Sequence, residues 1–170
     1  MKRAYLGLGS NVGDRSLMLQ QALAMLADHQ LRIVRVSPVY ETEPVGVRDQ
    51  PWFLNAVAEV DVDLFPMQLL ARVQRIEREM GRKRSREQGP RAIDIDILLF
   101  GRFVIDSPQL EVPHPRLAHR RFVLEPLADL VADLRHPVTR RTVREMLADT
   151  KTQVVRRTAI VLQLSVPIAQ

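Results

Sequence analysis

Asp94 and Asp96 lie two residues apart in an apolar, β-branched run that ends at Phe100. Such a run predicts a buried strand, and residues i and i+2 of a strand share one face. The two carboxylates therefore stand side by side and repel each other unless a cation lies between them. Mg²⁺ prefers oxygen ligands and often carries substrate phosphates. The pattern indicates metal-dependent phosphoryl chemistry.

The Asp-x-Asp spacing also occurs on solvated strand faces, where it binds no metal. Here the neighbours Ile93, Ile95 and Ile97 are apolar, and carboxylates are rarely buried without partners. The apolar surroundings therefore favour a metal site over a solvated face.

A basic segment precedes the aspartate pair. Residues 81–91 contain one acid, Glu87, and these basic residues: Arg82, Lys83, Arg84, Arg86 and Arg91. The planar guanidinium fork binds two phosphate oxygens at once. We expect this segment to hold the phosphates that the metal carries.

The glycines near the N-terminus do not form a known phosphate-binding loop. Gly7, Gly9 and Gly13 match neither the dinucleotide fingerprint nor the P-loop, which needs Gly-Lys-Ser/Thr. We expect them to serve a turn between a strand and a helix.

Phe53 and Asn55 share the less hydrophobic face of a predicted strand at 53–62. An aromatic ring beside an amide suits a flat heterocycle, which can stack on the ring while the amide reads its edge. The alternative is an ordinary packed Phe and a surface Asn, and it applies to Phe122 as well.

His114, between two prolines, is a candidate contact for a phosphate or an adenine.

The composition limits the functional classes. The chain has 170 residues, no cysteine, a net charge of +5 and a pI of about 10.4. Disulfides and thiolate catalysis are excluded, and no apolar run approaches the ~20 residues of a membrane span. The charge favours an anionic partner, and we expect a cytoplasmic protein that binds no membrane.

Hydrophobic periodicity and turn residues predict the order β-α-β-β-α-β, which is the ferredoxin-like pattern of an α+β fold with an antiparallel sheet. The predicted strands are 3–9, 31–40, 53–62 and 93–100, and the predicted helices are 16–26 and 66–81. A loop at 108–121, additional C-terminal helices at 123–131 and 142–147, and an added strand or partner contact at 160–166 follow. We expect a single domain over residues 1–150 and a tail of unassigned role at 151–170.

Eight short motifs, spread along the chain, add to this prediction of the fold. They are Gly9-Ser10-Asn11, Tyr40-x-Thr42-x-Pro44-x-Gly46, Asp49-Gln50-Pro51-Trp52-Phe53-Leu54-Asn55, Gln74-Arg75-Ile76-Glu77, Gly81-Arg82-x-Arg84, Gly89-Pro90-Arg91-x-x-Asp94-x-Asp96, Val112-Pro113-His114-Pro115-Arg116 and Arg120-x-Phe122-x-Leu124-x-Pro126-Leu127. Together they make the chain resemble 6-hydroxymethyl-7,8-dihydropterin pyrophosphokinase, an enzyme family of folate biosynthesis.

The resemblance implies transfer of pyrophosphate from the co-substrate ATP to the pterin hydroxymethyl group, with release of AMP. It implies that Asp94 and Asp96 hold two Mg²⁺ ions and that Arg82 and Arg91 are catalytic. The implied ATP-binding residues are Gln74, Glu77, Arg84, His114 and Arg120. The implied pterin-binding residues are Thr42, Pro44, Val45, Gly46, Phe53, Asn55 and Phe122.

Two other functions are compatible with the same fold class. A basic ferredoxin-like domain could bind RNA, but RNA-binding sheets expose two or three aromatic residues, and aromatic residues are only 5% of this chain. A nucleotide-sugar transferase could use Asp-x-Asp with Mn²⁺, but the chain is short for one. We therefore expect no nucleic-acid partner, and a monomer, with a homodimer through the tail as the alternative.

Overall fold

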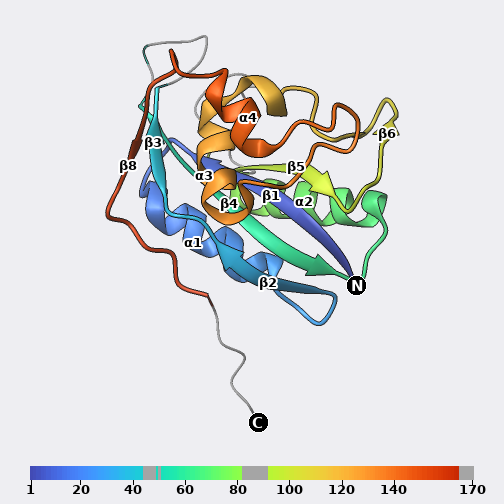
Figure 1. The fold of residues 1–170 in the computed structure, drawn as a ribbon. Coiled ribbons are helices and arrows are strands. Elements are labelled where there is room, and N and C mark those ends of the chain that lie inside the picture. Colours follow the sequence, from blue (N-terminus) through green and yellow to red (C-terminus); the bar gives the residue numbers. More distant parts are fainter. Residues whose placement is uncertain (44–48, 50, 82–91, 165–170) are drawn as a thin grey trace.

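The structure is a computed structural model that describes all residues except 44–48, 50, 82–91 and 165–170. Its elements follow the chain as β1 (Lys2–Ser10), α1 (Arg15–Leu26), β2 (Leu31–Val36), β3 (Tyr40–Thr42), β4 (Phe53–Val62), α2 (Pro66–Gly81), β5 (Asp94–Phe100), β6 (Ile105–Asp106), β7 (Glu111–Val112), a 3₁₀ turn (Leu117–His119), α3 (Arg121–Val131), α4 (Val143–Ala148) and β8 (Val155–Arg157). Figure 1 shows their arrangement. In the described part of the chain, no helix is long and apolar enough to cross a membrane.

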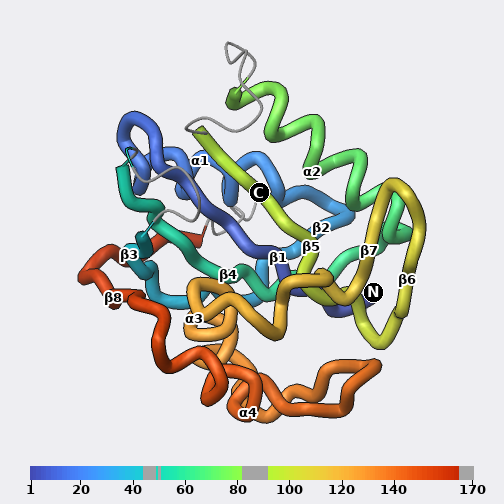
Figure 2. Tube along the Cα trace, turned by 90° about the horizontal axis from the view of Figure 1, so that it is seen from above, coloured from blue at the N-terminus to red at the C-terminus, as the bar shows by residue number. Residues whose placement is uncertain are grey.

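The molecule has three layers. Figure 2 shows α1 and α2 on one side of the sheet and α3 and α4 on the other. The strands are ordered β5-β1-β4-β3-β8, and β2 also pairs with β4. The pairs β1–β4, β1–β5, β2–β4 and β3–β4 are antiparallel. From β1 to β5 the elements follow the order β-α-β-β-α-β, with β2 and β3 together in the place of the second strand. This order and the order of the strands in the sheet confirm the ferredoxin-like α+β prediction.

Alternate residues of the central strands pack into two cores. Leu6 and Leu8 of β1 face α1 and α2, and Tyr5 faces α3 and α4. Helix α2 contributes the residues that its 3.6-residue period puts on one face: Leu69, Val73 and Ile76. Because helices cover both faces, β4 is buried from Leu54 to Val62. Its less hydrophobic face is therefore an interior face.

The strand predicted at 31–40 is two strands. β2 ends at Val36 and β3 begins at Tyr40. Between them Pro38 has no N–H to donate to a ladder, and the hydroxyl Oγ of Ser37 accepts the Val57 N–H at 2.9 Å. This side chain replaces a backbone partner and lets the chain change course while the buried N–H stays bonded.

Two further elements differ from the prediction. The segment predicted as a loop at 108–121 contains β7, which pairs with β6 in a small second sheet, and the 3₁₀ turn. The added strand lies at 155–157, where β8 pairs with β3, and residues 160–164 form no strand. The tail thus pairs with the sheet through a polar segment, and residues 165 and 166 of the predicted strand lie outside the described residues.

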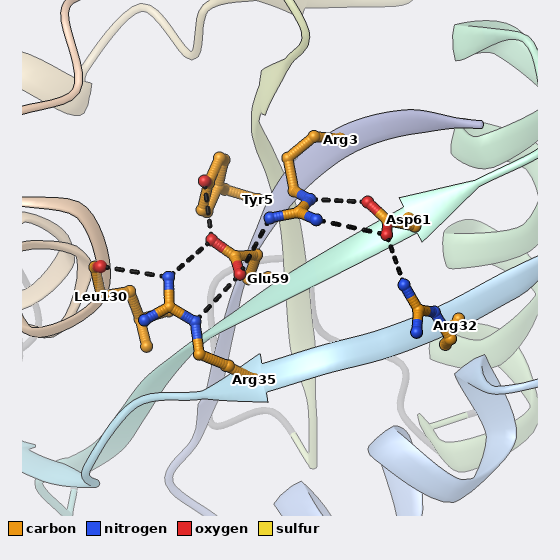
Figure 3. Close-up of polar contacts among 7 residues, drawn as sticks. All are labelled: Arg3, Tyr5, Arg32, Arg35, Glu59, Asp61 and Leu130. Carbon is orange, nitrogen blue, oxygen red and sulfur yellow. Dashed lines mark hydrogen bonds and ion pairs between the residues drawn. The ribbon is translucent and has the colours of Figure 1, made fainter.

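An ion-pair network lies on the α3 side of the sheet, between β1, β2 and β4 (Figure 3). The Glu59 side chain is only 1% exposed and binds Arg35 at 3.0 Å and Arg3 at 3.1 Å. It also accepts a hydrogen bond from the hydroxyl of Tyr5 at 2.8 Å. Asp61 accepts hydrogen bonds from Arg3 and Arg32. Every charge in this network therefore has a partner of opposite sign.

This network predicts how stability depends on pH. Burial opposes ionisation of Glu59, but hydrogen bonds from Arg35 and Tyr5 outweigh it and lower its pKa. Hydrogen bonds, first from Arg3 and then from Arg32, lower the pKa of Asp61. Since both pKa values lie below those of the unfolded chain, about 4.3 for Glu and 3.9 for Asp, the unfolded state protonates first as the pH falls. Stability is therefore full above about pH 5 and declines below it.

Chemical denaturation between pH 7 and pH 3 measures this decline. Glu59→Gln has no carboxyl group to titrate at that position, so its stability should fall less steeply over the same interval. Equal slopes for Glu59→Gln and the wild type would contradict a contribution of Glu59 to the acid sensitivity.

Candidate functional site

The aspartate pair lies at the start of β5, next to two glycines of β1. Asp94 is the register partner of Gly9, and Asp96 is the register partner of Gly7. Both carboxylates are partly buried. As predicted, they share one face of the sheet, and this is the face that α3 and α4 cover farther along.

Gly7 and Gly9 lie inside β1, so the prediction that they serve a turn was wrong. Their role is steric, because a strand residue without a side chain leaves space on the sheet surface. A Cβ built on Gly9 would stand 2.7 Å from Oδ1 of Asn55 and 3.6 Å from the ring of Phe53. Gly9 thus leaves the space between Asp94 on one side and Asn55 on the other.

Replacing Gly9 by alanine is expected to lower the free energy of unfolding by about 1–3 kcal/mol, the usual cost of overpacking. The added methyl group must displace the Asn55 amide, which is buried. Gly81→Ala is the control, because a Cβ there meets nothing within 4 Å, and the gain in helix propensity should leave stability unchanged or slightly raised. Thermal unfolding measures the stability of both variants. If Gly9→Ala were as stable as Gly81→Ala, the result would contradict the close contact at Gly9.

Asn55 is held in place by β3. Its Nδ2 donates a hydrogen bond of 2.6 Å to Oγ1 of Thr42, and its side chain is 8% exposed. Asn55 is therefore not the surface residue of the alternative interpretation. With Nδ2 directed at Thr42, its Oδ1 is directed at the space above Gly9. Two residues predicted to share a binding site are thus joined by a direct bond.

Two predicted site residues bind the outer edge of β5. A carboxylate oxygen of Glu77 on α2 accepts the Ile95 N–H at 3.1 Å. The backbone N–H of His114 donates to the Leu98 carbonyl at 2.9 Å. These contacts bring α2 and the segment after β7 to the strand that carries both aspartates. Gln74 lies one turn before Glu77 on α2 and is exposed.

His114 and Arg120 lie in the electrostatic field of Asp96. Burial lowers the pKa of His114; the charge of Asp96 opposes this, and the charges of Arg120 and Arg116 add to it. Burial also lowers the pKa of Arg120. Nδ1 of His114 accepts the Arg116 N–H at 3.1 Å, so a neutral ring carries its proton on Nε2. Near neutral pH the site therefore holds a neutral imidazole donor and a guanidinium cation beside Asp96.

Phe122 lies under Arg120. The guanidinium carbon of Arg120 is 5.4 Å from the centre of the Phe122 ring, within the range of a cation–π contact. Phe122 also packs against the α3–α4 core. This contact links a residue predicted for ATP with one predicted for the pterin.

Six predicted site residues lie outside the described residues: Pro44, Val45, Gly46, Arg82, Arg84 and Arg91. Their assignments stay predictions. One residue was missed: Arg116, whose charge acts on both His114 and Arg120. Its place directly after Pro113-His114-Pro115 was the available signal, because a cation beside a candidate phosphate contact extends the same positive site.

The donor set at the aspartate pair fits Mg²⁺. Among the residues that the structure describes, no group of three or more His, Cys, Asp and Glu could hold a metal by itself. Mg²⁺ typically binds one or two carboxylates and takes its other ligands from water and substrate phosphates. Asp94 and Asp96 supply that number of carboxylates.

Comparisons with known proteins identify the family. A sequence model of the 7,8-dihydro-6-hydroxymethylpterin-pyrophosphokinases matches residues 5–132. The chain is 48% identical over 137 residues to the 2-amino-4-hydroxy-6-hydroxymethyldihydropteridine pyrophosphokinase of Bacillus subtilis, covering 80% of this chain and 82% of that protein. The enzyme of the same name from Pseudomonas aeruginosa is 48% identical over 138 residues, or 81% and 85% of the two chains.

Other relatives are longer. The folic acid synthesis protein fol1 of Schizosaccharomyces pombe is 45% identical over 156 residues, which are 91% of this chain but 21% of that protein. A solved structure of Plasmodium falciparum HPPK-DHPS has a TM-score of 0.72 at 18% identity and covers 87% of this chain and 45% of that one; this likeness supports the fold alone. The family match and the bacterial relatives show that the chain belongs to the 7,8-dihydro-6-hydroxymethylpterin-pyrophosphokinase family and is a diphosphotransferase of folate synthesis.

Proposed function

We propose that the protein transfers pyrophosphate from ATP to the hydroxymethyl group of 6-hydroxymethyl-7,8-dihydropterin, releasing AMP, with two Mg²⁺ ions. The observation that carries this proposal is the row Asp94–Gly9–Asn55 across β5, β1 and β4. Carboxylates for a metal and an amide for a heterocycle stand there on either side of a residue without a side chain. The hydroxyl acceptor and the ATP phosphates would meet above Gly9.

The phosphate end of the site is built for charge. Bound Mg²⁺ would neutralise phosphate oxygens and align the acceptor hydroxyl with the phosphorus. Asp94 and Asp96 would hold the metal. Arg120 would add a fixed positive charge, which stabilises a transition state whose charge is spread over phosphate oxygens. Arg82 and Arg91, from the basic segment, complete the proposed catalytic groups.

The nucleotide is assigned to the outer edge of β5, where α2 and the segment after β7 contact this strand. His114 would donate from Nε2 to a phosphate or to adenine. The other residues proposed for ATP are Gln74, Glu77, Arg84 and Arg120. Since Glu77 and His114 both bind the β5 edge, the nucleotide would lie along the strand that carries the metal ligands.

The pterin is assigned to the β3–β4 side. Asn55 directs Oδ1 toward the space above Gly9, and this oxygen suits the N–H groups of a pterin edge. Phe53 and Phe122 would stack on the flat ring. The backbone from Thr42 to Gly46 completes the proposed pterin contacts. Because Asn55 is buried, it should discriminate strongly between ligands. A ligand without a matching N–H donor would leave Oδ1 of Asn55 unpaired.

The test is an incubation of purified protein with ATP, Mg²⁺ and 6-hydroxymethyl-7,8-dihydropterin, followed by separation of AMP from ADP. The proposal expects AMP that depends on the pterin and disappears with EDTA. ADP in place of AMP would indicate an ordinary kinase and overturn the proposal. The absence of turnover would overturn it as well.

We propose that the protein acts in the cytoplasm as a monomer, without nucleic-acid or membrane partners. Light scattering of the purified protein tests the oligomeric state.

A further inference from the structure

The segment after α4 returns to the sheet beside the proposed pterin site. We call residues 151–164 the C-terminal strap. Its strand β8 pairs with β3, Arg156 opposite Glu41 and Val155 opposite Thr42, and both figures of the chain trace show β8 next to β3. The strap therefore covers the edge of the strand that supports Asn55.

The strap stays attached to the rest of the chain after β8. Thr158 donates its backbone N–H to the Val39 carbonyl at 2.9 Å. Farther along, Gln163 and Gln20 of α1 exchange two hydrogen bonds, of 2.8 and 2.6 Å. Leu162 is 9% exposed and belongs to the core under α1 and α2. The strap is thus packed along its own domain.

Arg156 makes two contacts from the strap. Its Nη2 lies 3.1 Å from Oε1 of Glu41, and its guanidinium carbon lies 4.7 Å from the centre of the Trp52 ring. Arg15 of α1 holds the same two residues by other atoms. It binds Oε2 of Glu41 at 3.0 Å and the carbonyl oxygen of Trp52 at 2.8 Å. Glu41 is therefore shared by two arginines from distant parts of the chain.

These contacts hold the residues next to the proposed pterin contacts. Glu41 directly precedes Thr42, and Trp52 directly precedes Phe53, and Thr42 and Phe53 are register partners. The bond from Asn55 to Thr42 depends on this pairing. A shift of either segment would move Thr42, Phe53 and the Asn55 amide together.

We propose that Arg156 is a positioning residue for pterin binding and that the C-terminal strap sets the affinity for the pterin without touching it. This inference rests on the proposed function. Arg156 acts through Glu41 and Trp52, so its loss weakens binding of the pterin and leaves binding of ATP unchanged. A single tail residue thus affects one of the two substrates.

The adjacent residue provides a matched control. Arg157 is exposed and lies on the opposite face of β8, where its register partner is Tyr40. Arg156→Ala and Arg157→Ala remove the same charge from the same short strand. Only the first removes the contacts with Glu41 and Trp52. Since the Arg156 side chain is 63% exposed, both variants should fold, and thermal unfolding checks this.

The experiment measures pterin binding by calorimetry, in the presence of Mg²⁺ and a non-hydrolysable ATP analogue, and ATP-analogue binding separately. We expect Arg156→Ala to raise the pterin Kd about fivefold, from the loss of an exposed cation–π contact and an exposed ion pair. Arg156→Lys should recover part of the affinity, and Arg157→Ala should match the wild type. A second readout is the fluorescence of Trp52, the single tryptophan, which should change in Arg156→Ala and not in Arg157→Ala.

The outcomes separate this inference from the proposed function. If the wild type binds the pterin and Arg156→Ala binds it equally well, the strap has no positioning role and the proposed function stands. If both alanine variants weaken binding equally, net charge explains the effect and the inference is overturned. If the wild type binds no pterin, the proposed function fails and the inference fails with it.

Discussion

Asp96→Ala is expected to lower kcat by about 100-fold or more, the scale for loss of a key electrostatic group at the reacting centre. Asp96 shares a sheet face with Asp94 and lies opposite Gly7, so no neighbouring side chain of β1 can take its place. The charge of Asp96 raises the pKa of His114 against the effect of burial, and loss of the carboxylate removes this opposing effect. Steady-state measurement of pterin-dependent AMP formation gives the value.

Asp106→Ala is the control for this variant. Asp106 is an exposed aspartate on β6, outside the main sheet, and its loss should leave kcat within about twofold of the wild type. Raising the Mg²⁺ concentration should restore part of the activity of Asp96→Ala if the defect lies in metal binding. Wild-type turnover by Asp96→Ala would falsify the assignment of a metal ligand at this position.

Glu59→Ala is expected to lower the free energy of unfolding by about 2–3 kcal/mol. The Glu59 carboxylate is 1% exposed and is the common partner of Arg3, Arg35 and Tyr5. Its removal leaves a buried hydroxyl and two guanidinium groups without that partner, and losing hydrogen bonds to a charged group costs this much. The cost stays below that of a fully buried ion pair, because both arginines are half exposed and water replaces part of the interaction.

For a chain of this length, such a loss lowers the melting temperature by about 5–10 °C. Glu79→Ala is the matched control, because Glu79 forms an exposed pair with Arg75 at 3.8 Å on α2, and such pairs contribute little. Differential scanning calorimetry of the two variants measures the contrast. A melting temperature within 2 °C of the wild type for Glu59→Ala would mean that the network contributes nothing net to stability.

Regular periodicity explains why the main elements could be predicted from the sequence. β4 has the predicted bounds 53–62, and α2 has the predicted bounds 66–81. In each, side chains of one face repeat at the period of the element, and Pro66 marks the helix start. The Asp-x-Asp pair was predictable for the same reason, because a strand sets the direction of both side chains.

The features that escaped prediction depend on contacts between distant residues. A hydroxyl group of Ser37 that bonds to Val57 ends β2, and no local pattern shows such a partner. Gly9 resembled a turn residue because its role, to leave space beside Asn55, exists only when β1 and β4 are paired. Arg156 lies more than 100 residues from Trp52 along the sequence, and only the folded chain brings the two together.

The break between β2 and β3 has a consequence for how the enzyme can evolve. β4 pairs with β3 through its first residues, around Asn55, and with β2 through its last ones, around Glu59 and Asp61. Asn55 and Glu59 are four residues apart along the strand, about 13 Å, a separation at which substitutions without shared partners usually have additive effects. Changes that redirect acceptor preference at the β3 end can therefore accumulate while the β2 end keeps the fold stable. Stabilising substitutions around β2 should widen the range of active-site variants that this chain tolerates.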